Sequence, residues 1–218
     1  MEKKKKIVRL TTAGESLDDL LIGQLKYLNQ YFDIIAVAKD DGRLQKVRKR
    51  EGVRVVDAPI ERPISLLKDI IALRWLINFF KQEKPWCVHA NTPKGSLLAM
   101  VAAWICRVPH RIYTVTGLRY QGAIGKFKFV LQTMERITCA CATKVIPEGQ
   151  GVLKTLKNDH ITNKPLEVIL NGNINGKDTS FFSVESLYEN CELENGNKRL
   201  SIRKEESIKD VIRKELHI

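Results

Sequence analysis

The chain has 218 residues, of which 44% are hydrophobic, so it is long enough for one large α/β domain with a buried core. Its 37 Lys and Arg residues against 25 Asp and Glu residues give a net charge of +12, which favours an anionic partner: a phosphate-bearing ligand, a membrane surface or a nucleic acid. The alternative is that the basic residues lie on solvated helix faces. The longest apolar stretches, residues 70–80 and 97–106, are shorter than the roughly 20 residues that span a bilayer.

The elements that the sequence predicts alternate between strand and helix along the chain. Continuous apolar or β-branched runs predict strands over residues 7–12, 33–38, 52–56, 86–90, 110–116, 143–146 and 166–170. Three-to-four spacing predicts helices over residues 17–32, 43–50, 66–82, 97–106, 127–141 and 148–156. The alternation indicates an α/β fold: a doubly wound, Rossmann-like parallel sheet of about seven strands with helices on both faces.

Two details of the helices carry further expectations. Ser16 is a plausible N-cap for the first helix, with Asp18 and Asp19 in its first turn. The helix over 66–82 is apolar on nearly all sides, so we expect it to be well buried.

The character of the chain changes after Phe182. Residues 183–218 are polar and highly charged, have weak helical spacing and show no second series of strands. We therefore expect one domain over residues 1–182 and a linker or tail, polar helical or disordered, over 183–218.

A candidate ligand site lies where the strand over 86–90 turns into the following helix. Ligands of such sheets bind outside the carboxyl ends of the strands, and His89, Thr92 and Lys94 lie at this turn. The backbone N–H groups of the turn and the Lys94 ammonium favour an anion. The alternatives are a near-core histidine at 89 and an N-cap at Thr92 followed by proline at the first helical position.

Two other strand-to-helix connections contribute candidates at the same edge. Gly14, Glu15 and Ser16 follow the first strand, and the alternative is an ordinary turn. A dinucleotide site wants GxGxxG here, and only Gly14 is present, which disfavours a nucleotide-binding oxidoreductase. The fifth strand is followed by Thr116, Gly117 and Arg119, where the alternative is a surface arginine on a mobile loop.

No cofactor and no metal is expected. The sequence has no Asp-x-Asp and no His/Cys cluster, and Cys139-x-Cys141 lacks the second pair of ligands that zinc needs. The five cysteines, without a secretory signal, indicate reduced thiols and a cytoplasmic protein, soluble or peripheral.

Basic segments with neighbouring apolar residues suggest an anionic membrane surface as a partner. They are Lys3–Lys6, Arg43–Arg50 and the segment Lys126-Phe-Lys-Phe129, although the two phenylalanines are equally compatible with a core position. Nucleic acid is disfavoured as a partner, since there is no recognised binding motif and aromatic residues are only 7%.

Several segments together resemble the N-terminal, acceptor-side domain of a family 4 glycosyltransferase of the GT-B type, in the bacterial branch that builds surface polysaccharides on polyprenyl-phosphate carriers. The HxxTPK segment at His89 and the RIYTVTGLR segment at Arg111 are the most specific. The resembling segments are Thr11–Ser16, His89–Gly95, Arg107–Arg119, Glu135–Cys139, Ala142–Ile146 and Asn171–Asp178.

The resemblance implies a division of labour between two domains of a retaining enzyme. The N-terminal domain would bind a polyprenyl-phosphate-linked or other saccharide acceptor, and a donor domain would bind the nucleotide sugar. The implied acceptor residues are His89, Thr92, Lys94, Thr116, Gly117 and Arg119, although many relatives have His where Thr116 stands. Gly14, Glu15 and Ser16 would face the donor phosphates, and no catalytic residue is assigned.

Nothing in the sequence resembles the donor domain, so we expect half an enzyme that is inactive alone. It would be a laboratory fragment, a truncated gene product or one subunit of a split transferase, located on the inner face of the plasma membrane. The alternative is a non-catalytic binding or membrane-recruiting subunit that docks a separate donor-domain chain.

Overall fold

The computed structural model describes residues 4–170 and 172–174. These residues belong to the first compact unit of the chain, Met1–Gly176. The tail expected over residues 183–218 lies outside the described residues.

The described residues form one six-stranded sheet in which every pair of neighbours is parallel. Its strands are β1 (Lys6–Ala13), β2 (Asp33–Lys39), β3 (Arg54–Asp57), β4 (Cys87–Ala90), β5 (His110–Val115) and β6 (Lys144–Pro147). Their order is β3-β2-β1-β4-β5-β6, so the direction of winding reverses between β1 and β4. The doubly wound, Rossmann-like fold predicted from the sequence is confirmed.

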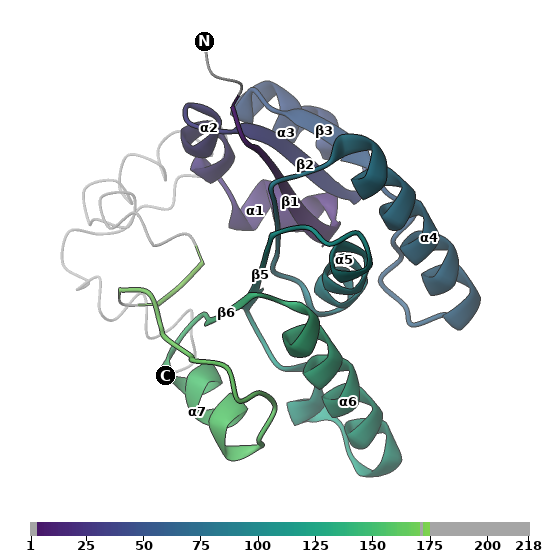
Figure 1. Cartoon of the computed structure of the whole chain (residues 1–218), viewed down its shortest axis with the longest axis vertical. Coiled ribbons are helices and arrows are strands. Elements are labelled where there is room, and N and C mark those ends of the chain that lie inside the picture. The colour runs from purple at the N-terminus through teal and green to yellow at the C-terminus, as the bar shows by residue number, and fades with distance from the viewer. Residues whose placement is uncertain (1–3, 171, 175–218) are drawn as a thin grey trace, which may run out of the picture. The chain divides into compact units, whose positions relative to one another are not determined.

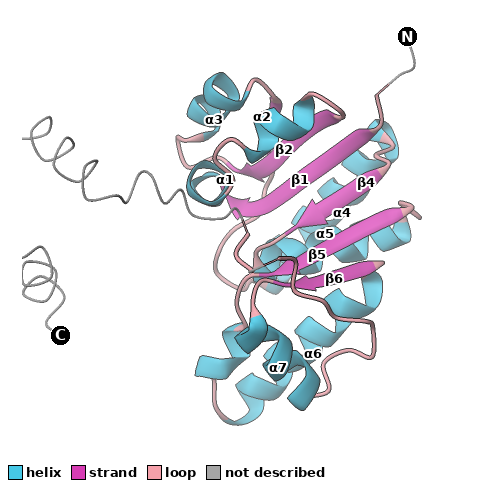
Figure 2. Cartoon of the chain, turned by 90° about the vertical axis from the view of Figure 1, so that its left-hand side faces the viewer, coloured by secondary structure: helices cyan, strands magenta, loops and turns pink. Residues whose placement is uncertain are grey.

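Helices cover both faces of this sheet. They are α1 (Gly14–Leu20), α2 (Gln24–Asn29), α3 (Leu44–Glu51), α4 (Leu66–Glu83), α5 (Pro93–Ile105), α6 (Gly125–Cys141) and α7 (Gln150–Asn158), with a short 3-10 turn η1 (Arg119–Gly122). Figures 1 and 2 show α1, α2 and α3 together on one face and α4 and α5 on the other.

Each face of the sheet has its own apolar core because side chains alternate along a strand. In β1, Val8 and Leu10 belong to the core under α4 and α5, whereas Ile7 belongs to the core under α1, α2 and α3. A strand packed on both faces needs apolar residues at consecutive positions, and β1 and β2 have them.

The predicted seventh strand is wrong. Residues 166–170 have no strand structure, and Leu170 is 92% exposed with a positive φ of 50°. The preceding Lys164 donates to main-chain carbonyls at the end of α6, among them Cys139 at 2.5 Å and Ala140 at 2.9 Å. Lys164 therefore attaches the chain to the end of α6 just before the apolar run, and residues 166–170 do not pair with a strand of the sheet.

The single helix predicted over 17–32 is two helices in the structure. α1 ends at Leu20, and Gly23, with a φ of 74°, is the N-cap residue of α2. The Gly23 N–H donates to Glu51 Oε1 at 3.0 Å. Ser16 is the third residue of α1 and does not cap it, because the helix begins at Gly14 with Ala13 in the N-cap position. α5 begins at Pro93, four residues earlier than predicted, with Thr92 in the N-cap position.

The expectation that the helix over 66–82 is well buried is also wrong for its first half. Ala72, Leu76, Phe79 and Phe80 are buried against the sheet. The opposite side of the first two turns is exposed, and its residues are Leu66 (77%), Leu67 (76%), Ile70 (45%) and Ile71 (59%). The apolar residues on all sides of α4 therefore form one face that packs on the sheet and, in its first two turns, a second face that is exposed.

Candidate functional site

The site candidates occupy the edge of the sheet at which the strands end. In a parallel doubly wound sheet, the crevice lies where the strand order reverses, which here is between the ends of β1 and β4. The chain leaves these two strands through Gly14 and Asn91, and it leaves the neighbouring β5 through Thr116.

Thr12 and Thr92 join β1 to the start of α5. The Thr12 N–H donates to Thr92 Oγ1 at 2.9 Å, and the two hydroxyls are 2.8 Å apart. Thr12 Oγ1 also accepts from the Gly95 N–H at 3.0 Å, so one of the free N–H groups of the helix is satisfied by a neighbouring strand. The structure places Thr92 at the crevice in a fixed, internally bonded position.

A Cβ at Gly95 would lie 2.7 Å from Thr92 Oγ1 and 3.0 Å from the Thr12 nitrogen. Glycine at position 95 is therefore required for this close approach between α5 and β1. The same contact holds the start of α5, which carries Lys94, against β1.

Lys94 is buried, and its ammonium group contacts α4 and the loop that precedes it. Its Nζ lies 2.5 Å from Asp69 Oδ1 and also donates to the Pro63 carbonyl. The ammonium charge is thus compensated by a carboxylate from the first turn of α4. Lys94 lines a narrow cleft of about 40 Å³ whose other polar lining residues include Arg119, Tyr120 and Glu135.

Arg119 is exposed and opens the η1 turn after β5. Because Lys94 and Arg119 line the same cleft, the structure brings these two predicted acceptor residues together at one rim. Thr116 Oγ1 donates to the Asn91 carbonyl at 2.7 Å, so the loops that follow β4 and β5 are tied to each other. Gly117 follows directly in this tied loop.

His89 lies on the face of the sheet, one residue before β4 ends. Its Nε2 is 2.8 Å from Thr114 Oγ1. Burial, and secondarily the neighbouring Arg9 charge, lower the pKa of His89 well below its usual range, so the imidazole is neutral at pH 7. It is therefore a neutral hydrogen-bonding group at this position.

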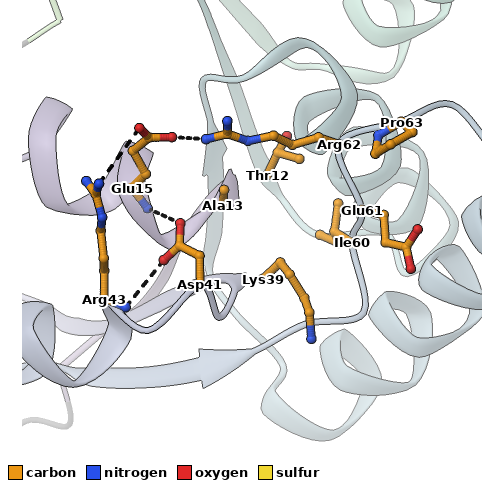
Figure 3. A pocket seen from close by; sticks show the side chains of 10 residues that line it. All are labelled: Thr12, Ala13, Glu15, Lys39, Asp41, Arg43, Ile60, Glu61, Arg62 and Pro63. Carbon is orange, nitrogen blue, oxygen red and sulfur yellow. Dashed lines mark hydrogen bonds and ion pairs between the residues drawn. The ribbon is translucent and has the colours of Figure 1, made fainter.

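Gly14, Glu15 and Ser16 form the first turn of α1, which borders a second and larger cavity of about 510 Å³ (Figure 3). The Glu15 N–H donates to Asp41 Oδ2 at 2.8 Å. The Glu15 carboxylate pairs with Arg62, and its Oε1 lies 3.9 Å from Arg43. This turn is part of a charged network that joins three loops.

Two residues that the structure places at this edge or in the cleft of Lys94 and Arg119 were assigned no role from the sequence. Asn91 is fully buried, and both ends of its side-chain amide have no partner among the described residues. Burial raises the pKa of Glu135 to about 7, despite a hydrogen bond with Tyr113 that lowers it. Glu135 falls in a segment that the resemblance included, but no signal in the sequence indicated this buried environment.

Within the described residues, no group of three or more His, Cys, Asp or Glu side chains is arranged to hold a metal ion. No helix in this part of the chain has the length and hydropathy of a bilayer-spanning segment.

The fold is shared with solved structures of other proteins. The chain superposes on the HepE protein of Anabaena, crystallised with UDP and glucose, with a TM-score of 0.61 and 15% identity, covering 87% of this chain and 50% of that one. For UDP-GlcNAc 2-epimerase of Neisseria meningitidis, the TM-score is 0.59 at 13% identity, covering 86% and 52%. The fold and the crevice define a Rossmann-like domain of the GT-B type.

A family model described as a glycosyl transferase 4-like domain matches residues 28–172. The chain belongs to this family, and the resemblance to family 4 glycosyltransferases drawn from the sequence is confirmed.

Two curated relatives are informative. The capsular polysaccharide biosynthesis glycosyltransferase CapM of Staphylococcus aureus is 36% identical over 160 residues, which is 73% of this chain and 40% of CapM. The UDP-Gal:alpha-D-GlcNAc-diphosphoundecaprenol alpha-1,3-galactosyltransferase of Escherichia coli is 32% identical over 120 residues, which is 54% of this chain and 31% of that enzyme. The chain spans less than half the length of both relatives.

Proposed function

We propose that residues 1–182 are the acceptor-binding half of a retaining glycosyltransferase that transfers a sugar from a nucleotide sugar to a lipid-linked saccharide. On this proposal, residues 183–218 lead to a donor-binding domain. The observation that carries the proposal is the common cleft of Lys94 and Arg119 at the carboxyl edge of a family 4 domain. The two relatives, named for capsular polysaccharide synthesis and for a sugar diphospholipid acceptor, supply the ligand class.

The proposed roles follow from the contacts of each residue. An ammonium has three N–H donors, and the Asp69 and Pro63 partners of Lys94 leave one for a phosphate oxygen of the carrier. Arg119, which is exposed, would supply a planar fork to the same diphosphate.

The remaining acceptor candidates act through position. Thr92 and Thr116 hold the crevice loops, Gly117 gives close access to the backbone, and His89 is a neutral hydrogen-bonding group beneath them. Gly14, Glu15 and Ser16 would face donor phosphates held by the opposite domain. Catalysis would then consist mainly of positioning and of charge stabilisation across the closed cleft.

We further propose that the domain binds the anionic inner surface of the plasma membrane through the first turns of α4 and α6. On α6, Ile124 is 89% exposed, Phe127 51% and Phe129 66%, beside exposed Lys126 and Lys128. The exposed apolar turns of α4 carry Lys68, and α5 packs between the two helices. Apolar side chains ringed by lysines match a surface of acyl chains and anionic headgroups.

The other two basic segments do not join this surface. Lys4 and Lys6 lie at the amino end of β1, where Lys6 pairs with Glu83 at 2.6 Å. Within α3, Lys46 and Arg50 pair with Asp18 on the other face of the sheet. The position of the membrane surface therefore rests on α4 and α6.

The α4–α6 surface also favours the second candidate, a non-catalytic subunit that recruits a separate donor-domain chain to the membrane. The two candidates differ in whether the acceptor itself binds to this chain. A recruiting subunit binds vesicles whether or not a lipid-linked diphosphate is present, whereas an acceptor-binding half binds the diphosphate specifically.

The test measures the affinity of the pure 218-residue chain for a short-chain prenyl diphosphate. We expect Arg119→Ala to weaken binding about tenfold, because one charge-assisted contact is lost. The matched control is Arg74→Ala, which removes an exposed arginine from α4 outside the cleft. Equal affinity in the wild type and both variants contradicts the proposal.

A transfer assay with a polyprenyl-linked acceptor and several nucleotide sugars tests the division of labour. We expect no transfer by the 218-residue chain alone. Clear turnover by the pure chain contradicts the assignment of donor binding to another domain.

A further inference from the structure

The cavity in Figure 3 lies beside the crevice, and the function proposed above uses only the Gly14–Ser16 turn at its border, whose backbone would face the donor phosphates. Three segments at the carboxyl edge line this open cavity of about 510 Å³: the start of α1, the connection from β2 to α3, and the connection from β3 to α4. Its charged residues are Glu15, Lys39, Asp41, Arg43, Glu61 and Arg62.

These six side chains are three cations and three anions, so the lining is formally neutral. A phosphate or diphosphate here would meet three carboxylates, and the cations would be needed to offset them. A neutral ligand with many hydroxyl groups has no such conflict. Carboxylates accept hydrogen bonds from hydroxyls, whereas guanidinium and ammonium groups donate to them. The lining therefore suits a sugar ring better than an anion.

One wall of the cavity is held in place before any ligand binds. Asp41 accepts from the Glu15 N–H at 2.8 Å and from the Arg43 N–H at 3.3 Å. A Cβ at Gly14 would lie 2.5 Å from Asp41 Oδ1, so glycine allows the carboxylate to approach the start of α1. Asp41 thus fixes the geometry of the turn.

The opposite wall consists of side chains that can exchange partners. The Arg62 side chain is 62% exposed and pairs with Glu15, and the Glu61 side chain is 41% exposed and pairs with Lys68 at 2.9 Å. Exposed ion pairs contribute little to stability, so hydroxyl groups can replace either partner at small cost.

The loop from β3 to α4 connects this cavity to the rest of the site. Residues 60–63 line the cavity, Ile64 lines the cleft of Lys94 and Arg119, and Leu66 and Leu67 begin the exposed apolar turns of α4. Within eight residues, this segment borders the formally neutral cavity, then the cleft lined by Lys94 and Arg119, and then the exposed apolar surface of α4. A lipid-linked saccharide presents its parts in this same order: sugar, diphosphate and lipid.

We propose that the cavity bordered by Glu15, Asp41, Glu61 and Arg62 holds a sugar ring of the acceptor and selects it by its hydroxyl groups. The proposal rests on the proposed function, since it assigns the saccharide of the same lipid-linked acceptor. It separates the acceptor site into a cavity that recognises the sugar and a cleft that recognises the diphosphate.

The experiment compares prenyl diphosphate probes in calorimetric titrations with the full 218-residue chain. One probe is a short-chain prenyl diphosphate without sugar, and three others bear N-acetylglucosamine, glucose or galactose. We expect at least one sugar to increase affinity about tenfold over the sugar-free probe, as a few polar contacts would.

Two variants test whether this gain in affinity comes from the cavity. Arg62→Ala and Glu61→Gln are expected to abolish the gain from the sugar and to leave the sugar-free probe within about twofold of wild type. The matched controls are Arg74→Ala and Glu167→Gln, which make the same charge changes at exposed positions outside the cavity.

Two outcomes overturn the proposal. One is a wild type for which none of the three sugars adds affinity over the sugar-free probe. The other is a loss in both variants that is equal for the probes with and without sugar. If the sugar-free probe binds and the sugars add nothing, only the cavity assignment fails. If no probe binds, the proposed acceptor-binding function fails with it.

Discussion

Glu51, the last residue of α3, connects α3 to the start of α2 through its side chain. Its carboxylate is buried and accepts from the Gly23 and Lys26 N–H groups, each at 3.0 Å, and from Arg50 at 2.7 Å. Burial alone would raise the pKa of Glu51, but these hydrogen bonds and the Arg50 charge hold it below its ordinary value of 4.5. The carboxylate therefore replaces the cap that α2 lacks.

Replacing Glu51 by Ala should destabilise the fold by about 2–4 kcal/mol, because it leaves two N–H groups and an arginine without their acceptor. Urea denaturation followed by circular dichroism measures the change. Glu167→Ala, at an exposed position, serves as the control, and a change in Glu51→Ala as small as in this control would contradict the assignment.

The same carboxylate predicts a pH dependence. Because the folded pKa is depressed, its stabilisation is complete above the unfolded value near 4.5 and is lost as pH falls through the folded pKa. Glu51→Gln should therefore lose less stability than the wild type between pH 5 and about pH 3. Parallel loss in the two proteins would show that the Glu51 charge contributes nothing.

Glu135 predicts the opposite behaviour, because burial raises its pKa from 4.5 to about 7. The unfolded chain loses this proton first, so the group reduces stability progressively as pH rises from 4.5 to 7. Relative to the wild type, Glu135→Gln should gain about 2–4 kcal/mol between pH 4.5 and pH 8. Urea midpoints of both proteins at the two pH values measure it, and the contribution of His89 cancels in the difference. A difference between the two proteins that does not change with pH would contradict it.

At the scale of elements, the exposed half of α4 is the most specific feature of the proposed membrane surface. Leu66→Gln with Leu67→Gln should weaken binding to phosphatidylglycerol-containing vesicles about tenfold or more, since two large apolar side chains no longer enter the bilayer. Stability should change little, because both residues are more than three-quarters exposed. Vesicle sedimentation at low and high salt gives the measurement.

Trp104→Gln is the matched control for this pair. Trp104 is 58% exposed near the carboxyl end of α5, away from the first turns of α4 and α6. Equal weakening in the control and in the α4 variant would show that exposed apolar residues act without regard to position.

The elements also show what sequence patterns can and cannot predict. Apolar runs located all six strands, because a strand packed on both faces needs apolar residues at consecutive positions. The run over 166–170 has the same pattern, but pairing depends on a neighbour that local sequence does not specify. The break at Gly23 depends on Glu51, which lies 28 residues further along the chain.

For the site, the sequence located the loops but not their contacts. The rule that ligands bind at strand ends placed Lys94 and Arg119 at one edge, and the structure puts them in one cleft. Their partners were not predictable. Asp69 pairs with Lys94 across 25 residues, and Arg62 pairs with Glu15 across 47 residues, so both pairings depend on the packing of separate elements.

At the scale of the whole described unit, the three features of the proposed acceptor site lie at one edge of the sheet. They are the sugar cavity, the cleft of Lys94 and Arg119, and the exposed first turns of α4 and α6. All three arise after strands β1 to β5 end, which follows from a sheet whose strands are all parallel. The amino edge contains Lys4, Lys6 and Trp86, which line neither the cavity nor the cleft of the proposed acceptor site.

Hydrogen exchange with and without a sugar-bearing short-chain prenyl diphosphate tests this arrangement most directly. We predict slower exchange in residues 13–16, 60–66, 91–95 and 116–122, the connections at the carboxyl edge, with no change at residues 84–86 and 107–110 at the amino edge. Protection at the amino edge, or on the face covered by α1, α2 and α3 with the carboxyl edge unchanged, would contradict the account.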